Sequence, residues 1–112
     1  PYFPLASGLL TGKYRKGKAA PDGSRLSFWE PRPHLVLGDA VLDRVERIAD
    51  LAEESGRTIL ELAVAWLLAR PQVASVIAGA TTSEQVRSNV AAAEWSISTG
   101  ELPVLDAKLG SR

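Results

Sequence analysis

The chain has 112 residues with 13 basic and 13 acidic side chains, so its formal net charge at neutral pH is zero. That balance argues against a nucleic-acid partner or an anionic membrane surface, because both require a strong positive field. The absence of cysteine excludes a disulfide framework, a thiolate metal site and a cysteine nucleophile, and it fits a cytoplasmic protein. No apolar run approaches the ~18 residues of a membrane span.

The first third of the chain is predicted to be mostly irregular. Residues 2–5 are expected to be the end of a strand. Residues 15–38 contain Pro21, Pro31 and Pro33 and show no periodicity, so we expect one long loop. Loops of more than ~15 residues in compact domains are usually functional or mobile.

The first predicted helix covers residues 39–54. Asp39 is placed to cap its start, and Gly56 is placed to end it, since glycine tolerates the left-handed conformation common after a helix. The pattern predicts an amphipathic helix. The apolar residues at helical spacing are Val41, Leu42, Val45, Ile48, Ala49 and Ala52.

A second helix is predicted over residues 58–70. Thr58 and Glu61 have the spacing of a capping box, in which each side chain hydrogen-bonds the backbone N–H of the other residue. Pro71 stops the helix after Arg70 because proline has no N–H to continue the ladder. The expected apolar face consists of Ile59, Leu62, Ala63, Trp66 and Leu67.

A strand and two more helices are predicted after Pro71. Residues 73–78 form a short apolar run that is typical of a buried strand. A third helix is expected from residue 82 or 83 to residue 95. Residues 98–101 have the pattern of another helix start, although Pro103 forfeits a hydrogen bond there unless it occupies the first helical position.

The turn between the predicted strand and the third helix has the features of an anion site. Gly79 and Ala80 let the backbone come close to a ligand. Residues 81–83 offer hydroxyl groups beside the unpaired N–H groups of a helix start, where the helix dipole favours negative charge. A phosphate group fits such a turn.

Gln85 and Asn89 are candidate ligand contacts on the helix that follows this turn. They are four residues apart, so they project from one helix face. A purely structural role for Gln85 is the alternative, because Thr82 and Gln85 also have the spacing of a capping box. The residues alone leave the two roles at even odds.

Two segments of the chain together resemble the C-terminal part of the aldo-keto reductases. One is Tyr2-Phe-Pro-Leu-Ala-Ser-Gly-Leu-Leu-Thr-Gly-Lys-Tyr14, and the other is Ser75-Val-Ile-Ala-Gly-Ala-Thr-Thr-Ser-Glu-Gln-Val-Arg-Ser-Asn89. The resemblance covers nearly the whole chain. It is closer to the bacterial reductases and the potassium-channel β-subunit branch than to the mammalian aldose reductase branch.

This resemblance implies an α/β fold, namely about the last two βα units of a (β/α)8 TIM barrel. A complete barrel takes about 250 residues, so residues 1–112 are expected to be a partial domain that lacks the N-terminal barrel portion. Residues 2–5 would end the seventh strand, and residues 73–78 would form the eighth. Both candidate binding segments then lie on the same face of the barrel.

The resemblance also implies that the chain binds NADP(H) through two segments. Residues 3–7 correspond to the segment that wraps the pyrophosphate and nicotinamide side. Gly79 and Thr81 correspond to positions at the 2′-phosphate, and Gln85 and Asn89 to positions at the adenine. The full implied set is Phe3, Pro4, Leu5, Ala6, Ser7, Lys13, Arg25, Gly79, Thr81, Gln85 and Asn89.

The chain departs from the family pattern in the second segment. Many members have lysine at the position of Gly79, arginine at Gln85 and glutamate at Ser88, so the charge that usually meets the 2′-phosphate is absent from this turn. In the branch that the chain resembles, positive charge comes from the first loop, where Lys13 and Arg25 stand at matching positions and can pair with phosphate. We therefore expect a preference for NADPH over NADH.

For the parent protein, the resemblance implies an oxidoreductase that reduces small-molecule aldehydes or ketones to alcohols. The catalytic aspartate, tyrosine, lysine and histidine of the family lie in earlier strands, so no catalytic residue and no metal ligand is assigned here, and the chain alone is expected to be inactive. A cofactor-binding regulatory subunit, like the channel β-subunits, is the alternative. A helix-turn-helix DNA binder is disfavoured by the neutral charge.

Overall fold

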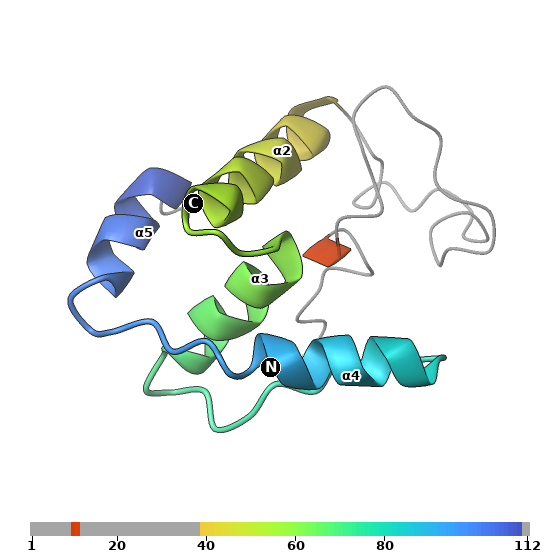
Figure 1. Ribbon diagram of the computed structural model, residues 1–112. Helices are drawn as coiled ribbons and strands as arrows, with labels where there is room; N and C mark the ends of the chain where they lie inside the picture. The colour runs from red at the N-terminus through yellow and green to blue at the C-terminus, as the bar shows by residue number, and fades with distance from the viewer. Residues whose placement is uncertain (1–9, 12–38, 111–112) are drawn as a thin grey trace.

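The computed structural model describes residues 10–11 and 39–110, and in this part of the chain four helices surround a small apolar core (Figure 1). Leu10 and Thr11 belong to a short 3-10 turn. None of the described helices is both long and apolar enough to cross a membrane. The helices are α2 (Asp39–Glu54), α3 (Ile59–Leu68), α4 (Ser83–Ala92) and α5 (Leu102–Leu109).

Helix α2 has the predicted bounds, and its predicted apolar face is buried except at Val41, which is exposed, and Ile48, which is partly buried. Its C-terminal end is closed as expected by Gly56, which adopts a φ of 68° in the left-handed region. The Gly56 N–H donates to the Glu53 carbonyl and the Arg57 N–H donates to the Ala52 carbonyl, each at 2.9 Å, which is the Schellman pattern. The predicted cap at Asp39 concerns a side chain outside the described part. The buried residues are Leu42, Val45, Ala49 and Ala52.

The predicted capping box at the start of α3 is confirmed. The Glu61 N–H donates to Thr58 Oγ1 at 3.2 Å, and the Thr58 N–H donates to Glu61 Oε2 at 3.3 Å. The helix ends at Leu68, before the predicted end at Arg70. Two effects explain the difference. Arg70 precedes Pro71, and the position before a proline disfavours the helical conformation. The Arg70 N–H also bonds the Leu67 carbonyl at 3.1 Å, three residues back instead of the four of an α-helix.

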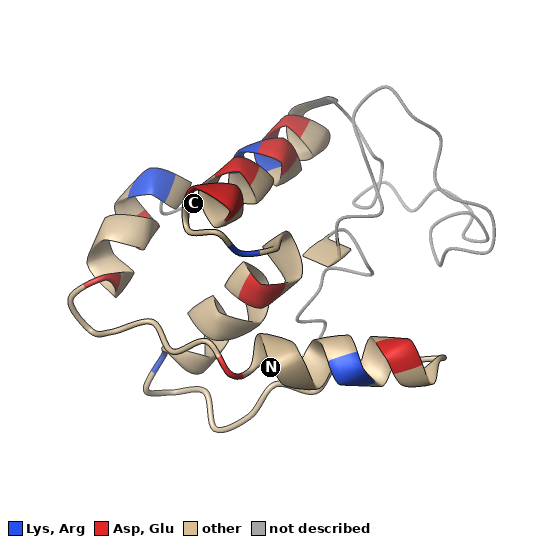
Figure 2. Cartoon of the chain, in the orientation of Figure 1, with Lys and Arg blue, Asp and Glu red and all other residues tan. Residues whose placement is uncertain are grey.

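Helix α3 lies at the centre of the described fold and packs against both α2 and α4. It carries a single charged residue, Glu61, whereas α2 is charged along its outer side (Figure 2). The predicted face is confirmed at its first three positions, but Val64 and Ala65 are buried as well. A prediction of one apolar face underestimates the burial of α3, because this helix has a neighbouring helix on each of two sides. Its buried residues are Ile59, Leu62, Ala63, Val64 and Ala65.

The predicted strand at residues 73–78 is not formed: residues 73–80 belong to neither a helix nor a strand. A strand exists only when a neighbouring strand pairs with its N–H and C=O groups. The predicted partner at residues 2–5 and the predicted loop at residues 15–38 lie outside the described residues. Ile77, which a sheet would bury, is 76% exposed.

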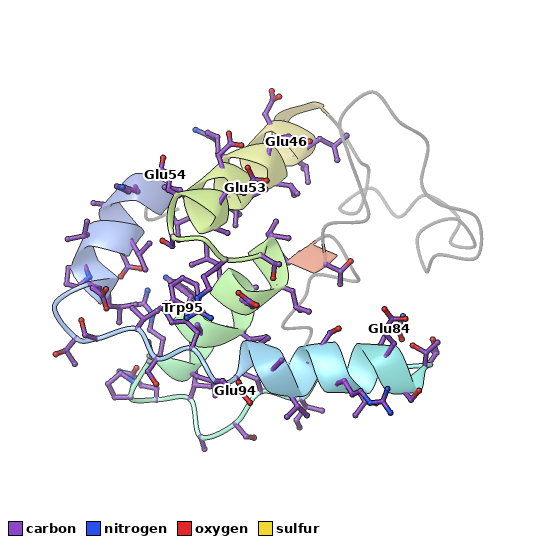
Figure 3. All side chains as sticks on the ribbon, in the orientation of Figure 1. Glu46, Glu53, Glu54, Glu84, Glu94 and Trp95 are labelled. Carbon is purple, nitrogen blue, oxygen red and sulfur yellow. The ribbon has the colours of Figure 1, made fainter. Side chains whose placement is uncertain are left out.

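Helix α4 ends at Ala92, earlier than the predicted residue 95. The chain leaves the helix through Ala93 and Glu94, whose N–H groups bond the carbonyls three residues back. This exit brings Trp95 beside α3, where it packs against the central core (Figure 3). The core residues there are Ala52, Leu62, Ala65 and Ile97.

The last predicted helix is present as α5. Ser98 and Glu101 hydrogen-bond each other's backbone N–H through their side chains, at 2.9 and 3.2 Å, and start the turn that leads into it. Pro103 is the second helical residue rather than the first. It is tolerated because the N–H groups of the first turn lack helical partners in any case.

Two polar links hold α5 to the rest of the described fold. Asp106 Oδ1 accepts hydrogen bonds from Trp66 Nε1 at 2.7 Å and from the guanidinium of Arg70, which also forms an ion pair with it. Lys108 pairs with Glu54 of α2 at 3.2 Å. No residue of α5 is fully buried, but Leu102 and Leu105 pack against the central core, and the two polar links add to these apolar contacts.

Candidate functional site

Four of the residues that the sequence singled out lie together at the start of α4. They are connected by hydrogen bonds to one another or to their immediate neighbours. This end of α4 lies on the opposite side of the described fold from α5 (Figure 1). The remaining seven candidates, at residues 3–7, Lys13 and Arg25, lie outside the described residues. The four are Gly79, Thr81, Gln85 and Asn89.

Thr82 forms the N-cap of α4. Its backbone is extended, with φ −130° and ψ 156°, and its side chain accepts a hydrogen bond from the Gln85 N–H at 3.1 Å. This is the first half of the predicted capping box. One of the four orphan donors of the helix start is thereby satisfied, and the others stay oriented along the helix axis.

The second half of the predicted capping box is replaced by a different contact. Gln85 Oε1 accepts from the Thr81 N–H at 2.7 Å and from the Thr81 hydroxyl at 3.1 Å. It therefore reaches past Thr82 to the preceding residue. The sequence left a role of Gln85 at the helix start as one of two alternatives, and it did not indicate that Thr81 is its partner.

Asn89 ties the other end of the turn to the helix. Its Nδ2 donates to the Gly79 carbonyl at 3.4 Å, and the side chain is half-buried. Within the described part of the chain, Gln85 Nε2 and Asn89 Oδ1 have no hydrogen bond. The two side chains thus order the turn while one donor and one acceptor stay available.

The turn is open and carries no basic side chain of its own. Gly79 and Thr81 are exposed, and a Cβ built on Gly79 meets no described atom within 4 Å. Glu84 places a negative charge in the first turn of α4. The attraction for an anion here comes from the helix start, and Glu84 opposes it. A phosphate at this turn therefore needs a cation from another segment.

A sequence model of the aldo/keto reductase family matches residues 1–109. The chain belongs to this family. Membership implies a TIM barrel, of which the described residues contribute helices and no strand. Family members typically use NAD(P)H and act on carbonyl substrates.

Three relatives illustrate the range within the family. The chain is 43% identical over 95 residues to the "Probable voltage-gated potassium channel subunit beta" of Arabidopsis thaliana, covering 83% of this chain and 29% of the relative. It is 33% identical over 111 residues to the L-glyceraldehyde 3-phosphate reductase of Escherichia coli K12, covering 94% and 31%. It is 35% identical over 105 residues to the NADH-specific methylglyoxal reductase of the same strain, covering 93% and 31%.

Two conclusions follow from these relatives. The chain spans less than a third of the length of each one, with shares between 29% and 31%. One relative is NADH-specific by name, so membership of the family does not decide between the two cofactors.

Proposed function

We propose that this chain forms part of the cofactor site of an NADPH-dependent aldo-keto reductase that reduces aldehydes or ketones to alcohols. One observation carries the proposal. The four described residues at positions where the family holds the adenosine end of the cofactor converge at the start of α4. They also leave the polar groups that such a ligand requires.

The residues of the turn have distinct roles in this proposal. The N-terminal amides of α4 meet the 2′-phosphate, and the Thr81 hydroxyl joins them when it gives up its hydrogen bond to Gln85 Oε1. Gln85 Nε2 donates to a ring nitrogen of adenine, and Asn89 Oδ1 accepts from its exocyclic amine. When bound, the cofactor supplies the hydride. The chain fixes the adenosine end and thereby limits where the nicotinamide can lie.

A preference for NADPH depends on Lys13 and Arg25. The described turn has no cation to meet the two charges of a 2′-phosphate, and Glu84 is unfavourable there. Lysine and arginine from the first loop supply what the turn lacks. We expect Lys13→Ala and Arg25→Ala to weaken binding of NADPH more than binding of NADH.

A chimera tests the proposed function. The chain replaces the matching segment of the E. coli L-glyceraldehyde 3-phosphate reductase, and carbonyl-dependent oxidation of NADPH is measured. We expect activity, with a raised KM for NADPH in Gln85→Ala and Asn89→Ala and little change in kcat. Glu94→Gln, an exposed change beyond the end of α4, is the matched control.

Two outcomes would contradict the proposal. One is a chimera that is folded by circular dichroism but neither binds nor oxidises NADPH. The other is an equal rise in KM for Asn89→Ala and Glu94→Gln. The 112-residue chain by itself should show no carbonyl-dependent oxidation of NADPH, since no catalytic residue is assigned to it.

A cofactor-binding regulatory subunit is the second candidate. The 43% identity to the Arabidopsis channel subunit favours it, because this identity is higher than that to the two E. coli reductases. The two candidates share the cofactor site and differ in whether the whole protein carries the catalytic tetrad of aspartate, tyrosine, lysine and histidine. Sequencing the complete coding region distinguishes them, since an intact tetrad favours the enzyme.

A further inference from the structure

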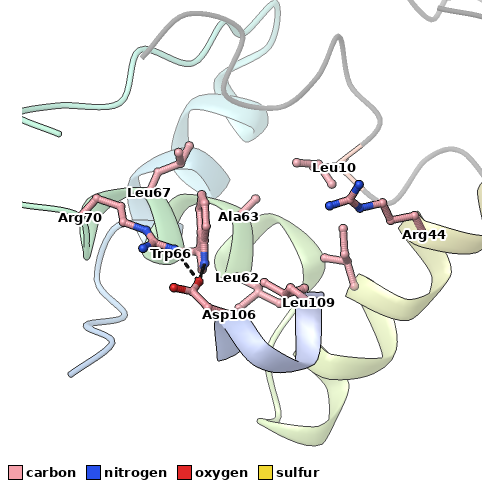
Figure 4. A pocket seen from close by; sticks show the side chains of 10 residues that line it. Leu10, Arg44, Leu62, Ala63, Trp66, Leu67, Arg70, Asp106 and Leu109 are labelled. Atoms are coloured by element: carbon pink, nitrogen blue, oxygen red, sulfur yellow. Dashed lines mark hydrogen bonds and ion pairs between the residues drawn. The ribbon is translucent and has the colours of Figure 1, made fainter. Parts of the chain in front are cut away.

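A cavity of about 560 Å³ lies between α2, α3, α5 and the turn at Leu10 (Figure 4). This volume falls within the range of about 300–1,000 Å³ that is usual for small-molecule sites. Apolar side chains make up most of the wall. They include Ile48 from α2, Leu62 and Ala63 from α3, and Leu109 from α5.

Two of the charged side chains in the cavity wall neutralise each other. Arg70 and Asp106 form an ion pair, and the Arg70 guanidinium lies over the Trp66 ring at 4.2 Å from its centroid. Trp66 Nε1 donates to the same carboxylate oxygen of Asp106 (Figure 4). These contacts fix both charges in place, so this end of the cavity has no net charge to offer.

The third charged side chain of the wall is Arg44, which α2 contributes on the side of Leu10 (Figure 4). Within the described residues, Arg44 makes no ion pair. Because Arg70 and Asp106 cancel, the described residues that line the cavity leave one uncompensated positive charge at an edge of its apolar wall. That distribution complements a molecule with an apolar body and a single negative charge.

We propose that this cavity binds a small amphipathic carboxylate. The apolar body lies against Leu62 and Ala63, where its removal from water drives binding. The carboxylate pairs with the guanidinium of Arg44, whose planar fork can donate two parallel hydrogen bonds. No residue of the cavity belongs to the turn at the start of α4, so this proposal is independent of the proposed cofactor site.

Titration of the ¹⁵N-labelled 112-residue chain with octanoate and with octan-1-ol tests the proposal. Octanoate should bind saturably at one site and shift the amide signals of α2, α3 and α5 near the cavity. Arg44→Gln should weaken octanoate binding about two- to five-fold, the range of an exposed ion pair, and leave octan-1-ol binding little changed. Arg47→Gln removes a charge on the same helix that does not line the cavity, and it should leave both affinities unchanged.

A space-filling variant provides a second readout. Ala63→Leu should weaken the binding of both octanoate and octan-1-ol, because the larger side chain fills space at the apolar wall. If this variant is unfolded, the comparison of Arg44→Gln with Arg47→Gln still tests the proposal. Non-saturable shifts spread over the whole chain would overturn the proposal. Equal weakening of octanoate by Arg44→Gln and Arg47→Gln would also overturn it.

Discussion

Gln85 Oε1 accepts two hydrogen bonds from Thr81, one from its backbone N–H at 2.7 Å and one from its hydroxyl at 3.1 Å. The side chain that we propose contacts the cofactor is therefore also a structural element of the turn. These two roles are compatible because the contact uses only the oxygen of the amide. The amide nitrogen stays available within the described part of the chain.

Gln85→Ala should lower the free energy of unfolding by about 0.5–1.5 kcal/mol, because the N–H and the hydroxyl of Thr81 both lose their exposed acceptor. Urea denaturation followed by circular dichroism measures the change. Arg87→Ala, on the same helix, is the control and should stay within about 0.5 kcal/mol of the unmodified chain. Equal effects of the two substitutions would mean that the Thr81 contact does not stabilise the turn.

Asp106→Ala should be the more damaging change, at about 1–3 kcal/mol, because Trp66 and Arg70 both lose a charged acceptor. Asp106→Asn should cost less, since its amide oxygen can still accept from Trp66. Urea denaturation followed by circular dichroism is again the measurement.

Lys108→Ala is the control for Asp106→Ala on the same helix. Its pair with Glu54 is exposed, with side-chain exposures of 52% and 61%, so we expect a loss of at most about 1 kcal/mol. If Lys108→Ala cost as much as Asp106→Ala, the link between α3 and α5 through Asp106 would not be the dominant one.

Gly56→Ala should destabilise the chain by about 1–2 kcal/mol. Gly56 has a φ of 68°, and a Cβ there meets no described atom within 4 Å, so the cost is that of a left-handed backbone alone. Gly100→Ala is the matched control, because Gly100 does not have a positive φ and its nearest contact would be Ser98 Oγ at 3.9 Å. The midpoint of thermal unfolding should be clearly lower for Gly56→Ala than for Gly100→Ala. Equal midpoints would contradict the left-handed conformation of Gly56.

The turn before α5 should weaken in acid. The Ser98 backbone N–H, and secondly the Ser98 side chain, lower the pKa of Glu101 below its ordinary value of 4.5. A lowered pKa means that the folded chain favours the ionised carboxylate. This stabilisation is present above pH 4.5 and is lost as the pH falls through the pKa of the folded state.

Glu101→Gln tests this pH dependence. The unmodified chain should be more stable than the variant at about pH 6, and the difference should shrink towards zero at about pH 3. Urea denaturation midpoints at the two pH values provide the comparison. A difference that stays constant over this range would show that ionised Glu101 does not support the turn.

Local signals in the sequence predicted the helices well. The capping box of Thr58 and Glu61 and the left-handed Gly56 depend only on residues within one or two helical turns, so their residue types suffice. The strand at residues 73–78 depends instead on a distant partner. Without that partner among the described residues, its apolar run has nothing to pair with. The pair of Arg70 and Asp106 likewise joins the turn after α3 to α5, and no local pattern indicates it.

The candidate turn was predictable in part. Spacing placed Gln85 and Asn89 on one helix face, and the N-cap pattern located Thr82. The contact between Gln85 and Thr81 depends on how the chain enters the helix, which spacing does not specify. It was not predictable from the sequence that Arg44 is the charge left unpaired in the cavity wall. That result depends on Asp106 of α5 facing Arg70 and neutralising it.

The most direct measurement is a titration of the ¹⁵N-labelled chain with adenosine 2′,5′-bisphosphate, with 5′-AMP for comparison. We predict saturable shifts centred on Gly79, Thr81, Gln85 and Asn89, tighter binding of the bisphosphate, and weaker binding by Asn89→Ala than by Glu94→Gln. The absence of saturable shifts at this turn, or shifts that Asn89→Ala leaves unaltered, would contradict a cofactor site at the start of α4.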